Sequence, residues 1–186
     1  YTVNSSLYAG VTNSTNLDGT ELLNINSTFD NIINIAKSKS TLEKVSIRLL
    51  ATNLVHGDEW KDNMYIQAKH YRQLVQATPK EVLALVDRSS VDKTTENLTK
   101  YRKESGQNYI YAIFSRPTAY YSYAALNTID VKRLGTSDLI EINYTTTDPG
   151  IAQNTVKILE DELMKAYEIL RFSATNNVIA YFEEEV

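Results

Sequence analysis

The two histidines, His56 and His70, are the residues in this sequence best suited to acid–base or metal chemistry. Asp58 and Glu59 follow His56 closely, and an imidazole beside carboxylates can bind a metal ion or transfer a proton. Their spacing matches no metal or catalytic motif, so we interpret them as surface or structural residues. Cysteine is absent, and the sequence has neither a nucleophile elbow nor a glycine-rich phosphate loop. We therefore expect no enzyme: no catalytic residue, no metal site and no cofactor.

A tyrosine-rich block from Tyr109 to Tyr123 is the best candidate for binding a ligand. Tyrosine presents an apolar ring face to a sugar ring and a hydroxyl group to the hydroxyls of the sugar. Arg116, in the same block, can pair with an anionic sugar or an acidic neighbour. We therefore take Arg116, Tyr120, Tyr121 and Tyr123 as candidate contacts with a glycan or a partner. Two alternatives stay open: the rings can pack a sheet or a subunit contact, and Arg116 can be a solvated charge.

From Pro149 to Val186 the sequence predicts one long helix, because Asp148 is a strong N-cap and proline suits the first helical position. Its apolar residues recur in a heptad-like stripe: Ala152, Val156, Leu159, Leu163, Ala166 and Leu170. At ~1.5 Å per residue the helix would be about 57 Å long, more than one small domain covers. Its outer half provides candidate oligomer contacts at Ala174, Val178, Tyr181 and Phe182. Packing within the same chain is the alternative for this stripe.

The composition is that of an ordered globular domain, with 42% of the 186 residues hydrophobic and 23% charged. The formal net charge is −4, and no basic block is present, so nucleic acid is not an expected partner. No run approaches the ~20 apolar residues that span a bilayer. The chain starts within a strand pattern and stops within a helix pattern. Both ends suggest a piece of a longer protein, and we expect residues 1–186 to form a single domain.

The patterns predict the elements in the following order. We expect a strand over 1–11, a helix around 29–36, and a helix from 40 to 57 that begins with a Ser40–Glu43 capping box. Helical turns follow over 58–86, with Thr78 as the cap of a short helix that starts at Pro79, and then a helix over 92–104. A strand from 109 to 116 and a hairpin of 126–134 and 139–145 around Gly135 precede the long helix. This order indicates an α+β fold: a small mixed β-sheet packed against helices, with a long protruding C-terminal helix.

Three stretches give the sequence a resemblance to a known family. They are Ser6–Tyr8; Phe29–Ile33 with Ser38–Val45; and the run of Ile129–Leu134, Ser137–Ile142 and Asp148–Ala152. The third is the most specific, because two strands and then an Asp-Pro helix start follow one another at short intervals. In order and spacing these stretches resemble the Wzz-type polysaccharide chain-length determinants, also called polysaccharide co-polymerases. They cover about a third of the chain.

The resemblance implies a non-catalytic regulator of the length of lipopolysaccharide O-antigen, capsule or exopolysaccharide chains. It implies a periplasmic domain of a bacterial inner-membrane protein, with a transmembrane helix expected on each side of this chain. The implied partners are other copies in a homo-oligomer, the polysaccharide polymerase and the nascent polysaccharide, with a tyrosine kinase as a partner or fused domain in some relatives. The alternative is a carbohydrate- or protein-binding module of a cell-surface complex, and a hydrolase with an unrecognised site is a third hypothesis.

Overall fold

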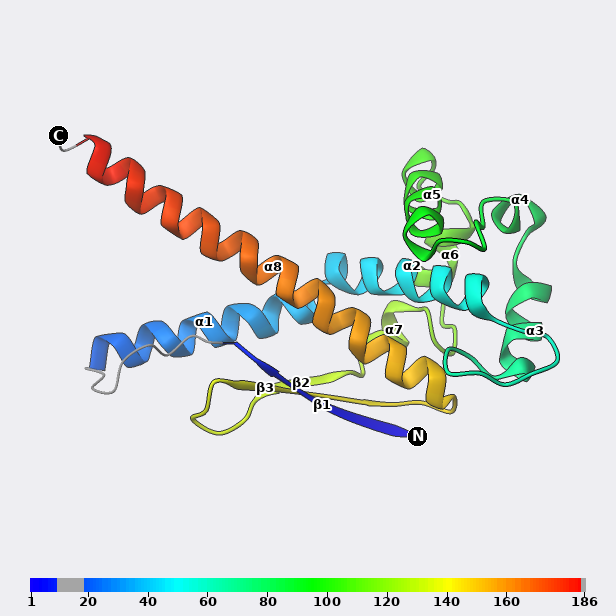
Figure 1. Ribbon diagram of the computed structural model, residues 1–186, viewed down its shortest axis with the longest axis horizontal. Helices are drawn as coiled ribbons and strands as arrows, with labels where there is room; N and C mark the ends of the chain where they lie inside the picture. Colours follow the sequence, from blue (N-terminus) through cyan, green and yellow to red (C-terminus); the bar gives the residue numbers. More distant parts are fainter. Residues whose placement is uncertain (10–18, 185–186) are drawn as a thin grey trace.

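The computed structural model describes residues 1–9 and 19–184 of the chain, and the side chains of 1–9 and 26–168. Within these residues three strands and eight helices occur, which confirms the α+β class. In chain order they are β1 (Thr2–Tyr8), α1 (Gly19–Lys37), α2 (Lys39–His56), α3 (Ala68–Ala77), α4 (Lys80–Leu83), α5 (Val91–Glu104), α6 (Tyr109–Ser115), α7 (Tyr123–Leu126), β2 (Asp130–Arg133), β3 (Leu139–Thr145) and α8 (Pro149–Glu184). Figure 1 shows the sheet beneath α1 and α8, with α3 to α6 gathered at one end of the molecule.

β3 is the central strand of a sheet with the order β1-β3-β2. Its side chains alternate: Ile140, Ile142 and Tyr144 are buried, and the residues between them are partly exposed. This is the pattern of a strand with one covered face, and α8 packs on that strand. The predicted hairpin is present, but its first strand starts at Asp130, because Leu126 ends helix α7. Gly135 adopts a φ of 58° in the turn, a conformation that glycine accepts without strain. All strand pairs in the described residues are antiparallel, although a mixed sheet was expected.

α2 is the central helix of the core. Twelve of its 18 residues are buried, so neighbouring elements cover it on nearly every side, among them α5, α8, α1 and α7. Ser38 is its N-cap, and the Ser38 hydroxyl accepts a hydrogen bond from Thr41 N at 3.2 Å. The predicted capping box is therefore wrong, because Ser40 falls inside the first turn. Glu43 instead pairs with Arg102 of α5 at 2.7 Å.

The segment Tyr109–Ser115 forms helix α6, which corrects the expected strand before Pro117. The side-chain oxygen of Asn108 accepts a hydrogen bond from a backbone N–H in the first turn at 3.1 Å. Ile110, Ile113 and Phe114 are buried, at the three- and four-residue spacing of one helix face. Burial of this face and the cap together outweigh the β-forming composition of the block, because intrinsic propensity is weaker than packing.

The region 58–86 is less helical than expected. Residues 58–67 form a loop in which Asp62 and Asn63 accept hydrogen bonds from nearby backbone N–H groups, at distances from 2.8 to 3.0 Å. Short polar side chains of this kind compete with helix formation. Thr78 ends α3 and donates its hydroxyl hydrogen back into that helix, and Pro79 occupies the N-cap position of α4. The expected cap of the short helix is therefore shifted by one residue.

α8 begins as predicted. One carboxylate oxygen of Asp148 accepts hydrogen bonds from Gly150 N at 3.0 Å and from Ile151 N at 3.2 Å. The inner part of the apolar stripe is buried against the sheet and α2: Ala152, Val156, Leu159 and Leu163. Beyond this part α8 continues as a helix that leaves the body of the molecule (Figure 1). No helix in the part of the chain described here is both long enough and apolar enough to cross a bilayer.

The first turn of α8 packs directly on the backbone of the loop before α3. A Cβ at Gly150 would lie 2.6 Å from the carbonyl carbon of Tyr65 and 2.9 Å from Ile66 N. We expect Gly150→Ala to push this turn away from the loop and to lower the free energy of unfolding by about 1–3 kcal/mol. Gly106→Ala is the matched control, since a Cβ there meets nothing within 4 Å. Urea unfolding measures both variants, and equal stabilities would contradict the close approach.

Candidate functional site

A cavity of about 390 Å³ lies between α3, α6 and the segment 116–121, and its volume suits a small ligand. We call it the tyrosine cavity. Its lining residues are His70, Gln73, Leu74, Ala77, Tyr109, Ala112, Ile113, Arg116, Thr118, Ala119, Tyr120 and Tyr121. Three of the candidate contacts, Arg116, Tyr120 and Tyr121, thus meet at one site. Tyr109 joins them, although the sequence analysis did not select it.

Tyr123, the fourth candidate contact, does not line the tyrosine cavity. It is the first residue of α7, and its ring lies edge-on to the ring of Phe114, with centroids 6.0 Å apart and planes at 73°. Phe114 is fully buried in the hydrophobic core. Tyr123 therefore contributes to packing against the core.

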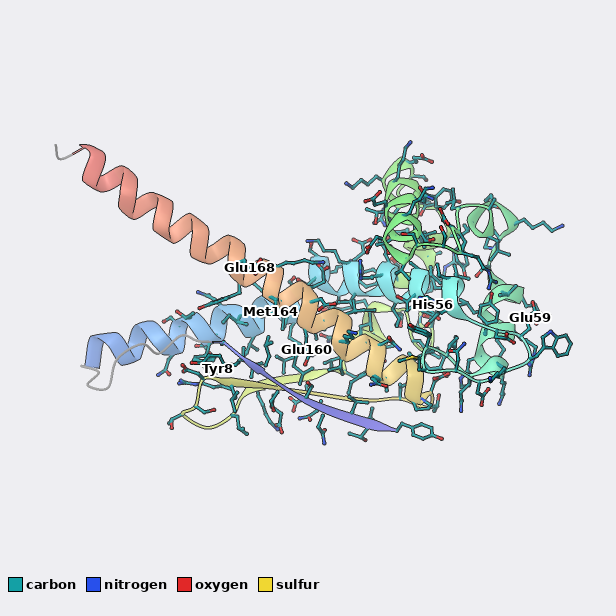
Figure 2. The ribbon with its side chains drawn as sticks, viewed as in Figure 1. Tyr8, His56, Glu59, Glu160, Met164 and Glu168 are labelled. Carbon is teal, nitrogen blue, oxygen red and sulfur yellow. The ribbon has the colours of Figure 1, made fainter. Side chains whose placement is uncertain are left out.

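The candidate oligomer contacts lie on the part of α8 that leaves the body: Ala174, Val178, Tyr181 and Phe182. The backbone there is helical, and these four side chains fall outside the described residues. Figure 2 shows Glu160, Met164 and Glu168 following one another along α8 toward its free end. Met164 is 42% exposed, so an apolar side chain is already uncovered in the last turns of α8 whose side chains the structure describes.

The hydroxyl groups of the three cavity tyrosines are held by the protein. Those of Tyr120 and Tyr109 each reach a threonine hydroxyl, at 2.8 and 3.2 Å, and that of Tyr121 accepts a hydrogen bond from Asn53 at 2.8 Å. Burial raises the pKa of each of these phenols, so all three are protonated at neutral pH. The cavity therefore offers a ligand mainly ring faces, where the sequence analysis expected hydroxyl groups as well.

His70 brings an oriented imidazole to the tyrosine cavity. His70 Nδ1 lies 2.7 Å from Oδ2 of Asp148, whose side chain is fully buried. A carboxylate only accepts hydrogen bonds, so Nδ1 carries a proton and Nε2 is the ring nitrogen left for a ligand. The sequence analysis missed this pair, because 78 positions separate the two residues and Asp148 is recognisable only as a helix cap. No spacing signal connects them.

Arg116 is the lining residue with a permanent positive charge, and no lining residue is acidic. Its side chain is exposed, and no ion pair joins it to the described part of the chain. Its backbone N–H bonds to Ala112 O at 2.9 Å and closes α6, which fixes the position of the residue. The site thus combines aromatic faces, one cation and one oriented imidazole. Such a set suits a ring-shaped ligand that carries hydroxyl or acidic groups.

His56, the other histidine, and the residues that follow it make contacts close to them in the sequence. The ring of His56 stacks on Tyr65, with centroids 4.1 Å apart and planes at 17°. Asp58 accepts hydrogen bonds from two backbone N–H groups of its loop, at 2.7 and 3.0 Å, and these bonds lower the pKa of its carboxyl group. Figure 2 shows His56 at the end of α2 and Glu59 in the loop that follows. Among the residues that the structure describes, no three metal-ligating side chains come together.

Comparisons with known proteins do not identify the chain. A scan against protein-family models gives no match, and searches of curated proteins and of solved structures each give no significant match. The resemblance to the chain-length determinants therefore depends on the motifs alone.

We expect Asp148→Asn to destabilise the fold and to change the tautomer of the His70 imidazole. An amide nitrogen in place of Oδ2 cannot accept a hydrogen bond, so the part-buried N–H of Gln67 and the Nδ1–H of His70 both lose their acceptor, at about 1–3 kcal/mol for each donor. Nitrogen NMR of the imidazole measures the tautomer. Neutral His70 should carry its proton on Nδ1, and Asp148→Asn should shift it toward Nε2 while His56 stays unchanged. A proton on Nε2 in the unaltered protein would contradict the contact.

Proposed function

We propose that this chain is a non-catalytic component of bacterial surface-polysaccharide assembly that contacts the glycan at the tyrosine cavity and regulates chain length within an oligomeric scaffold. One observation carries the proposal: the rings of Tyr109, Tyr120 and Tyr121 surround one cavity, with Arg116 at the same site. The motif resemblance supplies the biological setting, and the cavity supplies the contact with a glycan.

The chemistry of a sugar ring matches that of the tyrosine cavity. A pyranose has an apolar face of C–H groups and a polar edge of hydroxyl groups. The tyrosine rings fit the apolar face. His70 Nε2, the amide of Gln73 and the guanidinium of Arg116 provide acceptors and donors for the polar edge or for an acidic substituent.

Helix α8 supports the scaffold part of the proposal. Its 36 residues extend about 54 Å at ~1.5 Å per residue, and only the first part lies on the body (Figure 1). An apolar stripe that leaves the body is stabilised by packing on another helix, which favours a homo-oligomer. In this proposal the chain is a periplasmic domain of an inner-membrane protein. It acts beside the polymerase and the nascent polysaccharide, with a tyrosine kinase as a partner or fused domain.

Isothermal titration with fragments of the host surface polysaccharide tests the contact at the cavity. We expect Tyr120→Ala to weaken binding about tenfold or more, equivalent to ~1.4 kcal/mol, because it removes one ring face of the cavity. Tyr8→Ala is the matched control, since Tyr8 is 65% exposed and lies outside the cavity. If no fragment binds the unaltered protein, or if both variants bind alike, the cavity is not the glycan contact.

The scaffold role is tested in the bacterium that makes the polysaccharide. We expect the double variant Val178→Glu, Phe182→Glu to reduce cross-linked oligomers and to change the modal polysaccharide length, because it adds charge to the apolar stripe. Asn176→Glu is the control, since at ~100° per residue this position lies about 160° around the helix from Val178 and about 120° from Phe182. An unchanged length distribution at normal protein levels would leave only the alternative function, a carbohydrate- or protein-binding module.

A further inference from the structure

A second hollow of about 520 Å³ lies between α2, α5 and α8 and shares no lining residue with the tyrosine cavity. We call it the basic groove. Its lining residues are Ser40, Glu43, Lys44, Ile47, Arg48, Thr95, Thr99, Arg102, Lys103, Glu162 and Lys165. Five of these side chains are basic and two are acidic, although the chain as a whole has a net charge of −4. The fold therefore gathers positive charge that is dispersed along the sequence.

The groove contains both fixed and unpaired cations. Arg102 is fixed twice, since it pairs with Glu43 at 2.7 Å and lies over the ring of Tyr111 at 5.0 Å from the centroid. Lys44 and Lys103 are exposed, and no ion pair links either of them to a side chain that the structure describes. These two ammonium groups are free to bind an anion, and the guanidinium of Arg102 is held in place beside them by Glu43 and Tyr111.

The remaining polar groups of the groove favour a ligand with hydroxyl groups. The hydroxyls of Thr95 and Thr99 each donate to a backbone carbonyl of α5 at 2.7 Å, so their oxygen lone pairs are left to accept. A ligand that fits must therefore supply both negative charges and hydroxyl donors. Acidic sugars such as uronic acids carry both on one ring.

We propose that the basic groove binds an acidic oligosaccharide segment whose charges come from uronic acid residues. Arg48, Arg102 and Lys165 are each paired with a carboxylate, of Asp92, Glu43 and Glu162 in that order, which leaves Lys44 and Lys103 as the two cations of the groove that are unpaired among the described side chains. A polyuronate carries one charge per sugar unit, which suits a groove with a few unpaired cations. A double-stranded nucleic acid is a poorer match, because DNA carries one charge per ~1.7 Å of its axis, more than the two unpaired lysines of the groove can neutralise. That the ligand is a glycan rests on the proposed function, whereas the preference for anions follows from the groove itself.

The test is isothermal titration with a hexamer of galacturonic acid, with a neutral glucose hexamer as the second probe. We expect the acidic hexamer to bind more tightly and to lose affinity as salt rises. Lys44→Glu with Lys103→Glu should weaken its binding about tenfold or more. Lys61→Glu with Lys80→Glu is the matched control, because it makes the same change in net charge at exposed lysines outside the groove. Circular dichroism of each variant checks that the fold is retained.

The outcomes separate this inference from the proposed function. No binding of the acidic hexamer, equal binding of the two hexamers, or equal loss in both lysine variants would overturn the basic groove. So would a single-stranded oligonucleotide of equal charge that binds more tightly than the acidic hexamer. If the neutral hexamer binds and Tyr120→Ala abolishes that binding, the tyrosine cavity stands even where the groove fails. Binding that depends on Lys44 and Lys103 but not on Tyr120 supports the groove and counts against the cavity.

Discussion

The side chain of Asp148 is fully buried and accepts hydrogen bonds from four N–H groups. One oxygen holds the first turn of α8, through Gly150 and Ile151, and the other holds the start of α3, through Gln67 and His70. A buried carboxylate is costly unless its oxygens are satisfied, and here both are. This residue fixes where the long helix starts and how the imidazole of the tyrosine cavity is oriented. The projecting helix and the candidate binding site therefore depend on the same contact.

Further contacts beside Asp148 join the loop before α3 to the start of α8. Gly150 lets the loop backbone at Tyr65 approach α8 closely, and Asn154 donates hydrogen bonds from α8 to Met64 O at 2.9 Å and to Gly150 O at 2.7 Å. The loop before α3 is thus joined to the beginning of α8 by backbone contacts as well as by Asp148. With β3 pairing on one side and this loop on the other, the start of α8 has little freedom. The direction in which the helix leaves the body follows from that constraint.

The sequence indicated those parts of the fold that depend on local patterns. Alternation in β3, the turn at Gly135 and the Asp148 cap are set by neighbours in the chain, and the structure contains all three. The segment Tyr109–Ser115 is a helix although its residues favour β structure, because one of its faces packs on the core. The His70–Asp148 pair had no local signal at all, since only the packing of α3 against the start of α8 brings the two residues together. The same holds for the basic groove, whose cations come from three separate helices.

Helix α2 links the two candidate binding surfaces. Its first ten residues contribute Lys44 and Arg48 to the basic groove, and its last turns support the tyrosine cavity, because Asn53 bonds to the hydroxyl of Tyr121. Ser46 also donates a hydrogen bond to Tyr121 O at 2.6 Å. Lys44 and Asn53 are nine positions apart, which corresponds to about 14 Å along the helix at ~1.5 Å per residue. Since α2 is buried on nearly every side, this separation is fixed. A glycan long enough to reach both surfaces would gain affinity by holding its second contact at a high effective concentration, and a rigid spacing maximises that gain only for a matching length of glycan.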